Sequence, residues 1–237
     1  MEVLARAHAV PSSAAAVWTL AGITLTRLGR GKAPWIGAGI AGLPLVLAVA
    51  GRSHPELASP GVLLELQMVI LALLSAMFVA TSIGEEIDDR TSTYLWSRPI
   101  ARWAVLAGKL CALTPIVAAL LVAGWCGAIA LATGAAPTLA SCLALGASAV
   151  AASLIAAGIA TVMPRYGMAM TIGYVLVDTF VGLLPFSAQE ISITHQTTVL
   201  ANLDSEPRTL AMPLLTMALI SGVWAVVGFV RIRRLEV

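Results

Sequence analysis

The charged residues that could act together lie in one short polar segment, residues 84–103, between two long apolar stretches. Acids come first and bases follow, and the last base stands just inside the next apolar stretch. The acids are Glu85, Glu86, Asp88 and Asp89, and the bases are Arg90, Arg98, Arg102 and Lys109. Such an order of charges suits docking to a polar partner, because complementary charges steer an encounter and set its register.

Two further acids stand inside apolar stretches. Glu65 lies near the expected outer end of its stretch, and Asp178 lies close to the middle of another. A carboxylate at the centre of a bilayer costs on the order of 3 kcal/mol, so such groups face protein or water. We expect Asp178 and Glu65 to be candidates for a translocation path. The alternatives are a hydrogen-bonded structural acid for Asp178 and a side chain that reaches the interface for Glu65.

Catalytic and nucleotide-binding patterns are absent from the sequence. There is no His-Glu-x-x-His zinc motif and no Gly-x-Ser-x-Gly nucleophile elbow. Gly31-Lys32 is followed by Ala33 and Gly108-Lys109 by Leu110, so neither has the hydroxyl that a phosphate-binding loop places on magnesium. We therefore expect no enzyme activity, metal or cofactor in this chain. Work driven by ATP would need a partner subunit that binds ATP and Mg.

The composition indicates a multi-pass membrane protein. Hydrophobic residues make up 59% of the chain and charged residues 11%, with a mean hydropathy of +0.93, whereas soluble domains carry about 25% charged residues. A span needs roughly 20 mainly apolar residues. Six stretches qualify, which predicts an all-α fold with six transmembrane helices: Ala33–Ala50, Gly61–Ile83, Val105–Leu131, Leu139–Met163, Met168–Phe186 and Leu210–Val230.

Lysine and arginine are distributed unevenly over the expected loops. Cytosolic loops of membrane proteins carry an excess of these residues. With both termini in the cytosol, twelve of the 14 bases lie inside, and only Arg52 and Arg208 lie outside. The opposite orientation would invert this ratio. The distribution therefore predicts two cytosolic termini, in agreement with an even number of spans.

The remaining segments complete a single membrane domain. Residues 1–32 form a tail and a helix with one apolar stripe, expected to lie along the inner interface. Residues 33–237 form the transmembrane domain, with a cytosolic loop at 84–104 and an outer interfacial segment at 187–209. In the fourth span Ser148, Ala152, Ala156 and Ala160 form a stripe of small residues, which allows close helix packing within the chain or across a dimer.

The polar segment resembles the loop after the second span of ABC-2 type transporter permeases. The family pattern has an acid, a Gly-Thr, a leucine, a Ser-x-Pro, a base and a Gly-Lys that enters the third span. The matching residues here are Glu86, Thr91, Leu95, Ser97, Pro99, Arg102 and Lys109. Arg90 stands where the family usually has glycine, which changes the expected local turn.

This resemblance implies a function and a set of partners. Two permease chains pair, most simply as a homodimer, and each docks a cytosolic ATPase subunit through the loop between spans two and three. The implied location is the bacterial inner membrane, in contact with lipid and without nucleic acid. The implied activity is export, and a haem-exporter-type permease fits the same pattern.

Two other classes of function stay open from the residues alone. A secondary transporter driven by an ion gradient would use Asp178, with Glu65 as a second candidate, to carry protons or sodium ions. No internal repeat is evident, and no span is clearly broken in matching positions, as such transporters often require. An intramembrane enzyme would need paired polar groups inside the bilayer, and the sequence offers no convincing pair.

Overall fold

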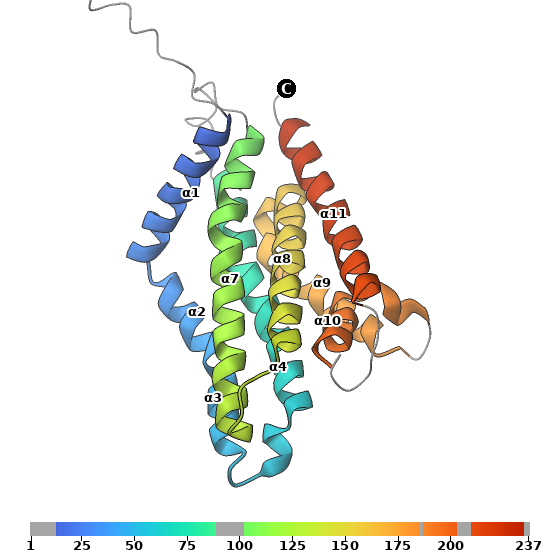
Figure 1. Ribbon diagram of the computed structural model, residues 1–237. Coiled ribbons are helices and arrows are strands. Elements are labelled where there is room, and N and C mark those ends of the chain that lie inside the picture. Colours follow the sequence, from blue (N-terminus) through green and yellow to red (C-terminus); the bar gives the residue numbers. More distant parts are fainter. Residues whose placement is uncertain (1–12, 89–101, 185–186, 203–209, 235–237) are drawn as a thin grey trace, which may run out of the picture.

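The computed structural model describes residues 13–88, 102–184, 187–202 and 210–234, and their regular structure is entirely helical. The all-α prediction is thereby confirmed for these residues. Figure 1 shows the helices as one bundle of long, roughly aligned rods. The helices are α1 Ser13–Arg30, α2 Ala33–Ala41, α3 Leu43–Ala50, the 3₁₀ helix η1 Pro55–Ala58, α4 Pro60–Leu74, the π-helix η2 Ser75–Ala80, α5 Thr81–Asp88, α7 Arg102–Thr133, α8 Leu139–Val162, η3 Pro164–Tyr166, α9 Gly167–Gly182, η4 Ser187–Ile191, α10 Ile193–Ala201 and α11 Ala211–Arg234.

Five helical segments in the described ranges are long and apolar enough to cross a membrane. They are Ala33–Ala50, Pro60–Asp88, Trp103–Thr133, Leu139–Val162 and Ala211–Arg234. The expected span Met168–Phe186 corresponds to α9, which has 16 residues and a length of about 24 Å. The hydrocarbon core is about 30 Å thick, and α9 is also shorter than the shortest of the five segments, which has 18 residues.

Large apolar side chains on the outside of the bundle agree with a lipid surrounding. Trp35 is 80% exposed, Phe180 is 69% exposed and Val46 is 66% exposed. Large apolar side chains are exposed on all the long described helices, including α1, α2, α3, α8, α9 and α11. The exposed residues therefore support the multi-pass membrane class on grounds independent of composition.

The first expected span is broken near its middle. Helix α2 ends at Ala41 and α3 begins at Leu43, with Gly42 between them and Pro44 in the first turn of α3. Proline has no backbone N–H to donate to the carbonyl four residues earlier, and its ring clashes with that carbonyl. The sequence Gly42-Leu43-Pro44 contains the signal for this break, which lies in one span only and leaves open the expectation that no spans are broken in matching positions.

The second span continues further than the sequence suggested. Helices α4, η2 and α5 follow one another without a gap, so the helix ends at Asp88 instead of Ile83. Ser75 begins the π-helical turn and its hydroxyl donates to the carbonyl oxygen of Leu71 at 2.7 Å. The acids Glu85, Glu86 and Asp88 consequently project from a helix, where their spacing is fixed.

Helix α1 lies beside the first half of α7 (Figure 1). The predicted apolar stripe faces this helix, because Ala21 is 4% exposed while Trp18 and Ile23 on the remaining surface are 71% and 58% exposed. A Cβ on Gly108 would lie 2.9 Å from the carbonyl oxygen of Val17, so α1 approaches α7 closely there. The stripe thus has a packing role in the bundle.

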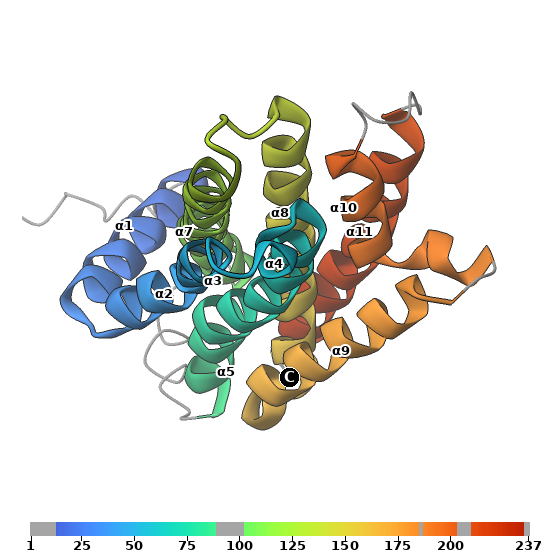
Figure 2. The same ribbon diagram turned by 90° about the horizontal axis from the view of Figure 1, so that it is seen from below.

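Helix α8 occupies the centre of the bundle, with α7 on one side and α10 and α11 on the other (Figure 2). The small-residue stripe Ser148, Ala152, Ala156 and Ala160 is at most 3% exposed throughout. These residues are therefore buried within the single chain. Of the two interpretations that the sequence left open, packing inside the subunit accounts for the stripe.

The crossing of α8 and α11 provides a test of this packing. A Cβ on Gly158 would lie 2.6 Å from the carbonyl oxygen of Trp224, whereas a Cβ on Gly146 of the same helix meets nothing within 4 Å. We expect Gly158→Ala to lower stability by about 1–3 kcal/mol, the range for overpacked cores. Gly146→Ala should leave stability equal or slightly higher, because alanine favours helix. Thermal unfolding of both variants in one detergent measures the difference, and equal melting temperatures would contradict the crossing.

Candidate functional site

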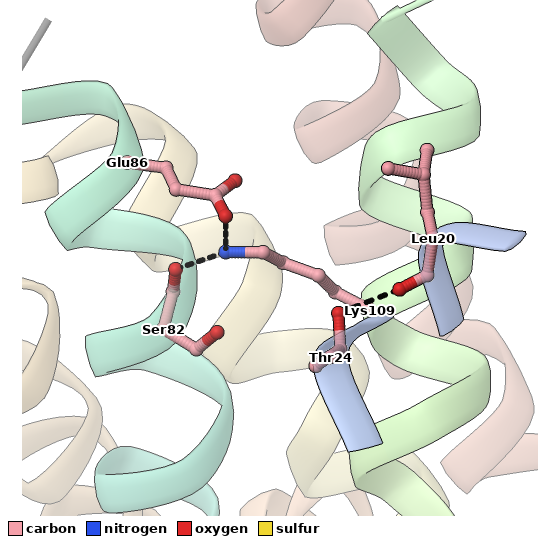
Figure 3. Close-up of polar contacts among 5 residues, drawn as sticks. All are labelled: Leu20, Thr24, Ser82, Glu86 and Lys109. Carbon is pink, nitrogen blue, oxygen red and sulfur yellow. Dashed lines mark hydrogen bonds and ion pairs between the residues drawn. The ribbon is translucent and has the colours of Figure 1, made fainter. Parts of the chain in front are cut away.

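Lys109 is a buried cation in the second turn of α7. Its side chain is 6% exposed, and its Nζ lies 2.8 Å from Oε1 of Glu86 on α5. The ammonium also donates a hydrogen bond to the backbone carbonyl oxygen of Ser82. Figure 3 shows the lysine reaching from α7 across to α5, where both acceptors point toward it. A buried lysine is stable only when paired and hydrogen-bonded, and these two partners meet that condition.

The pair joins the two helices that flank the predicted loop. Helix α5 ends at Asp88 and α7 begins at Arg102, so Glu86 and Lys109 lie shortly before and shortly after the intervening segment. We name this contact, made by Glu86, Lys109 and the Ser82 carbonyl, the α5–α7 clasp. The clasp joins the helix ends on both sides of that segment.

Helix α1 covers the clasp from the other side. Thr24 lies near Lys109 in Figure 3, one helical turn after Leu20. Its hydroxyl donates to the Leu20 carbonyl oxygen at 2.8 Å. This internal bond satisfies the Thr24 hydroxyl. The lysine therefore keeps its partners on α5, while α1 lies beside it and borders the same open cavity.

A cavity of about 440 Å³ opens beside the clasp, between α1, α2, α5 and α7. Its lining combines basic and acidic side chains with the apolar side chains of Met77, Phe78 and Leu113. The charged residues of the lining are Arg27, Lys32, Glu85, Glu86 and Lys109. The cavity is thus a polar indentation of the bundle at the clasp, and Glu85 and Glu86 reach it from a helical scaffold.

The residues predicted for partner docking fall into two groups. Glu85 and Asp88 are exposed on α5, Glu86 is half-buried in the clasp, and Arg102 is the first residue of α7. The other predicted residues lie in 89–101, outside the described residues: Asp89, Arg90, Thr91, Leu95, Ser97, Arg98 and Pro99. The described part therefore shows the helical frame of the predicted docking segment.

The two candidate acids of the translocation path have different surroundings. Glu65 is an exposed residue of α4 and lines a cavity of about 700 Å³ between α4, α7, α8, α9 and α10. This cavity lies toward the end of the bundle opposite the clasp, where α7 ends and α8 begins. Its lining does not include Asp178. The structure thus does not bring the two acids into one site.

Asp178 is 9% exposed, and hydrogen bonds surround its carboxylate. Oδ1 accepts from the backbone N–H of Ile193 at 3.0 Å, and Oδ2 accepts from the backbone N–H and the hydroxyl of Thr194 at 2.9 and 2.7 Å. The Ser192 hydroxyl lies 3.1 Å from Oδ2. An acceptor at the first N–H groups of a helix is a cap, so Asp178 of α9 fixes the start of α10.

A family comparison covers most of the chain that forms these sites. Residues 54–230 match the sequence model described as ABC-2 family transporter protein. The chain belongs to the ABC-2 transporter family. The matched range contains the clasp, the 700 Å³ cavity and the Asp178 cap, and only part of the lining of the cavity beside the clasp. No curated protein matches the chain.

Membership of the ABC-2 family confirms the resemblance drawn from the polar segment. The chain is therefore a multi-pass membrane permease of the ABC transporter class, a class that associates with an ABC ATPase subunit. The clasp occupies the two ends of the segment that carried the resemblance, since Glu86 and Lys109 were the first and last residues of the matching pattern.

Several partners in these sites were not anticipated from the sequence. The Ser82 carbonyl of the clasp is backbone and leaves no sequence signal. The partners of Asp178 do leave one, because Ser192-Ile193-Thr194 before an apolar helical stretch is typical of a helix N-terminus. The signal identifies a cap but does not say that an acid from another helix of this ABC-2 protein shares it.

Proposed function

We propose that this chain is the membrane-spanning subunit of an ATP-driven ABC-2 type exporter. In this proposal six spans place both termini in the cytosol of a bacterium, α9 with its flanking residues being the fifth span. Two copies pair in the inner membrane, and segment 84–104 docks a cytosolic ATPase subunit that binds ATP and Mg. Closure of the ATPase subunits displaces the segment and thereby the helices on both sides of it.

The α5–α7 clasp is the observation that carries this proposal. A docking segment transmits force only if its two ends are held in a fixed relation to the spans. Lys109 ties α7 to the end of the α4–η2–α5 rod through Glu86 and Ser82. Gly84 adds a second tie, because a Cβ there would lie 2.5 Å from the carbonyl oxygen of Pro164, which follows α8. Displacement of the segment would therefore reach α7, α5 and α8 together.

The alternative of a transporter driven by an ion gradient has less support. Its proposed carrier, Asp178, is occupied by hydrogen bonds from α10, and release of a proton or sodium ion would have to break that cap in every cycle. Membership of the ABC-2 family also favours ATP as the energy source. A dependence of transport on the proton gradient, without ATP, would nevertheless restore this alternative.

Co-purification from native membranes in mild detergent tests the proposal. We expect an ATPase subunit with a phosphate-binding loop to remain bound at close to one copy per permease chain. The complex should hydrolyse ATP, whereas the permease chain alone should not. Recovery of the chain without an ATPase in several mild detergents would count against the proposal and make the gradient-driven alternative the next one to test.

Replacement of Pro99 and Arg102 together tests the docking segment. The double variant Pro99→Ala, Arg102→Ala should lower transport per ATP hydrolysed at least tenfold, because proline restricts the backbone at its own position and arginine provides a charge for docking. Transport and hydrolysis by the complex in vesicles measure this ratio. The control, Arg52→Ala with Pro55→Ala, changes the same residue types beyond α3, at the other end of the bundle, and should couple normally. Unchanged coupling in the first variant would exclude a docking role for these two residues.

A further inference from the structure

The cavity at the opposite end of the bundle from the clasp has the size of a binding site for a small organic molecule. Its volume of about 700 Å³ falls within the roughly 300–1,000 Å³ typical of ligand pockets. Helices α4 and α9 supply its two walls, and α10 and the ends of α7 and α8 close it. The cavity is thus built from five separate helices and is not a gap within one loop.

The chemistry of the lining selects one class of molecule. Most lining residues are apolar, among them Met68, Ile129, Ile172 and Leu176. Glu65 is the one acid among the described lining residues, and these include no lysine or arginine. Within the described part of the chain, no ion pair or hydrogen bond is made by the Glu65 side chain. A single carboxylate in an apolar cavity favours a ligand with an apolar body and one positive charge.

The alternatives to such a ligand meet a physical cost. An anion would be repelled by Glu65 and would find no lysine or arginine in the described lining, where His195 is the one basic side chain. A neutral apolar molecule would displace water from the carboxylate without replacing it, and burial of an unpaired charge is costly. A strongly hydrated ion would gain nothing from the apolar walls. Trp125, whose indole N–H donates to Ser141 at 3.0 Å, contributes an aromatic side chain to the same lining, and aromatic rings attract cations.

We propose that this cavity is the cargo site of the transporter and that its cargo is a hydrophobic organic monocation held by the Glu65 carboxylate. The inference rests on the proposed export function for its biological meaning. The binding site itself is a property of the permease chain alone. The tightly hydrogen-bonded Asp178 takes no part in it, and His195 is the other titratable side chain of the lining.

Equilibrium binding to the purified full-length chain in lipid nanodiscs tests the inference. The probe is radiolabelled tetraphenylphosphonium, and the uncharged comparison compound is triphenylphosphine oxide. We expect saturable binding of the cation, at least tenfold weaker in Glu65→Gln and retained in Glu65→Asp. The uncharged compound should bind the unmodified chain more weakly than the cation does, and Glu65→Gln should not weaken its binding, because no carboxylate is then left unpaired. Glu56→Gln is the matched control, since Glu56 is an exposed acid of η1 outside the lining, and it should bind the cation normally.

A second variant keeps the test decisive if Glu65→Gln fails to fold. Gly61 lines the cavity, and a Cβ there meets nothing within 4 Å, so Gly61→Trp should fill the space and weaken binding of both compounds. Equal cation binding by the unmodified chain, by Glu65→Gln and by Gly61→Trp would overturn the inference, as would the absence of saturable binding. No ATPase is present in the assay. Cation binding without recovery of an ATPase would therefore contradict only the proposed function, and recovery of an ATPase without cation binding would contradict only the cargo site.

Discussion

Replacing Glu86 with alanine is expected to destabilise the protein and to stop ATP-driven transport. The substitution leaves the ammonium of Lys109, a residue that is 5% exposed, with the Ser82 carbonyl as its remaining acceptor in the clasp. Breaking a buried ion pair by removing one partner costs about 3–5 kcal/mol. The Glu86 side chain is 26% exposed, so water offsets part of the loss and we expect about 3 kcal/mol. Thermal unfolding in detergent and transport in vesicles measure the two effects.

The neighbouring acid provides the matched control. Glu85 is exposed on the same helical turn and makes no ion pair to Lys109 among the described contacts, so Glu85→Ala should change the melting temperature little. If Glu86→Ala melts at the same temperature as Glu85→Ala, the pair does not stabilise the fold.

Removing both charges separates stability from coupling. In the double variant Glu86→Leu, Lys109→Met neither charge is left buried alone, and replacing an ion pair by apolar residues of similar size is often neutral for stability. We expect its melting temperature to return close to that of the unmodified chain while coupling stays low, because the tie to the Ser82 carbonyl is lost as well. Full recovery of coupling would show that the clasp has no transmitting role.

The long spans could be predicted from the sequence because each requires only a run of apolar residues. Four of the six expected spans match single continuous helical segments to within a few residues, for example Leu139–Met163 against Leu139–Val162 of α8. Break points were harder to predict. Gly42 and Pro44 left a readable signal, but nothing in Ser75–Ala80 distinguishes a π-helix from an α-helix, because its extra residue per turn is set by the packing around it.

Pairings between helices could not be predicted for a related reason. Helices that are apolar on all sides have no clear face, so their sequences do not say which turn meets which neighbour. Glu86 and Lys109 were both named as docking residues, yet their contact depends on how α5 packs on α7. The same holds for Glu65 and Asp178, which are both acids in apolar sequence stretches. Glu65 lines a cavity, whereas Asp178 caps a helix.

Asp178→Asn is expected to loosen the outer segment that contains α10. The carboxylate now accepts hydrogen bonds from the Ile193 and Thr194 backbone N–H groups and from the Thr194 hydroxyl. Asparagine keeps one acceptor oxygen, but its NH₂ group is a donor and faces some of these donors. Hydrogen bonds to a charged group contribute about 1.5–3 kcal/mol each, so we expect a loss of about 3 kcal/mol after partial compensation. Amide hydrogen exchange across 193–201 should become at least tenfold faster, with a lower melting temperature.

A nearby acid serves as the control for this effect. Glu190 of η4 is exposed, and its carboxylate accepts one hydrogen bond, from the Gln196 side-chain amide at 3.1 Å. The same amide also donates to the backbone carbonyl oxygen of Glu190 at 2.7 Å. Glu190→Gln keeps the backbone bond, so exchange in α10 should stay nearly unchanged. The comparison isolates the cap from a general effect of neutralising an acid in this segment.

The same variant distinguishes a cap from an ion carrier at Asp178. A cap that fails should release α10 and reduce transport in proportion to the amount of folded protein lost. A carrier that fails should abolish transport while the amides of Ile193 and Thr194 remain as protected as before. Because the carboxylate holds both amides directly, we expect exchange and transport to change together. Full amide protection with abolished transport would make Asp178 part of the transport path, and the gradient-driven alternative would then regain its main support.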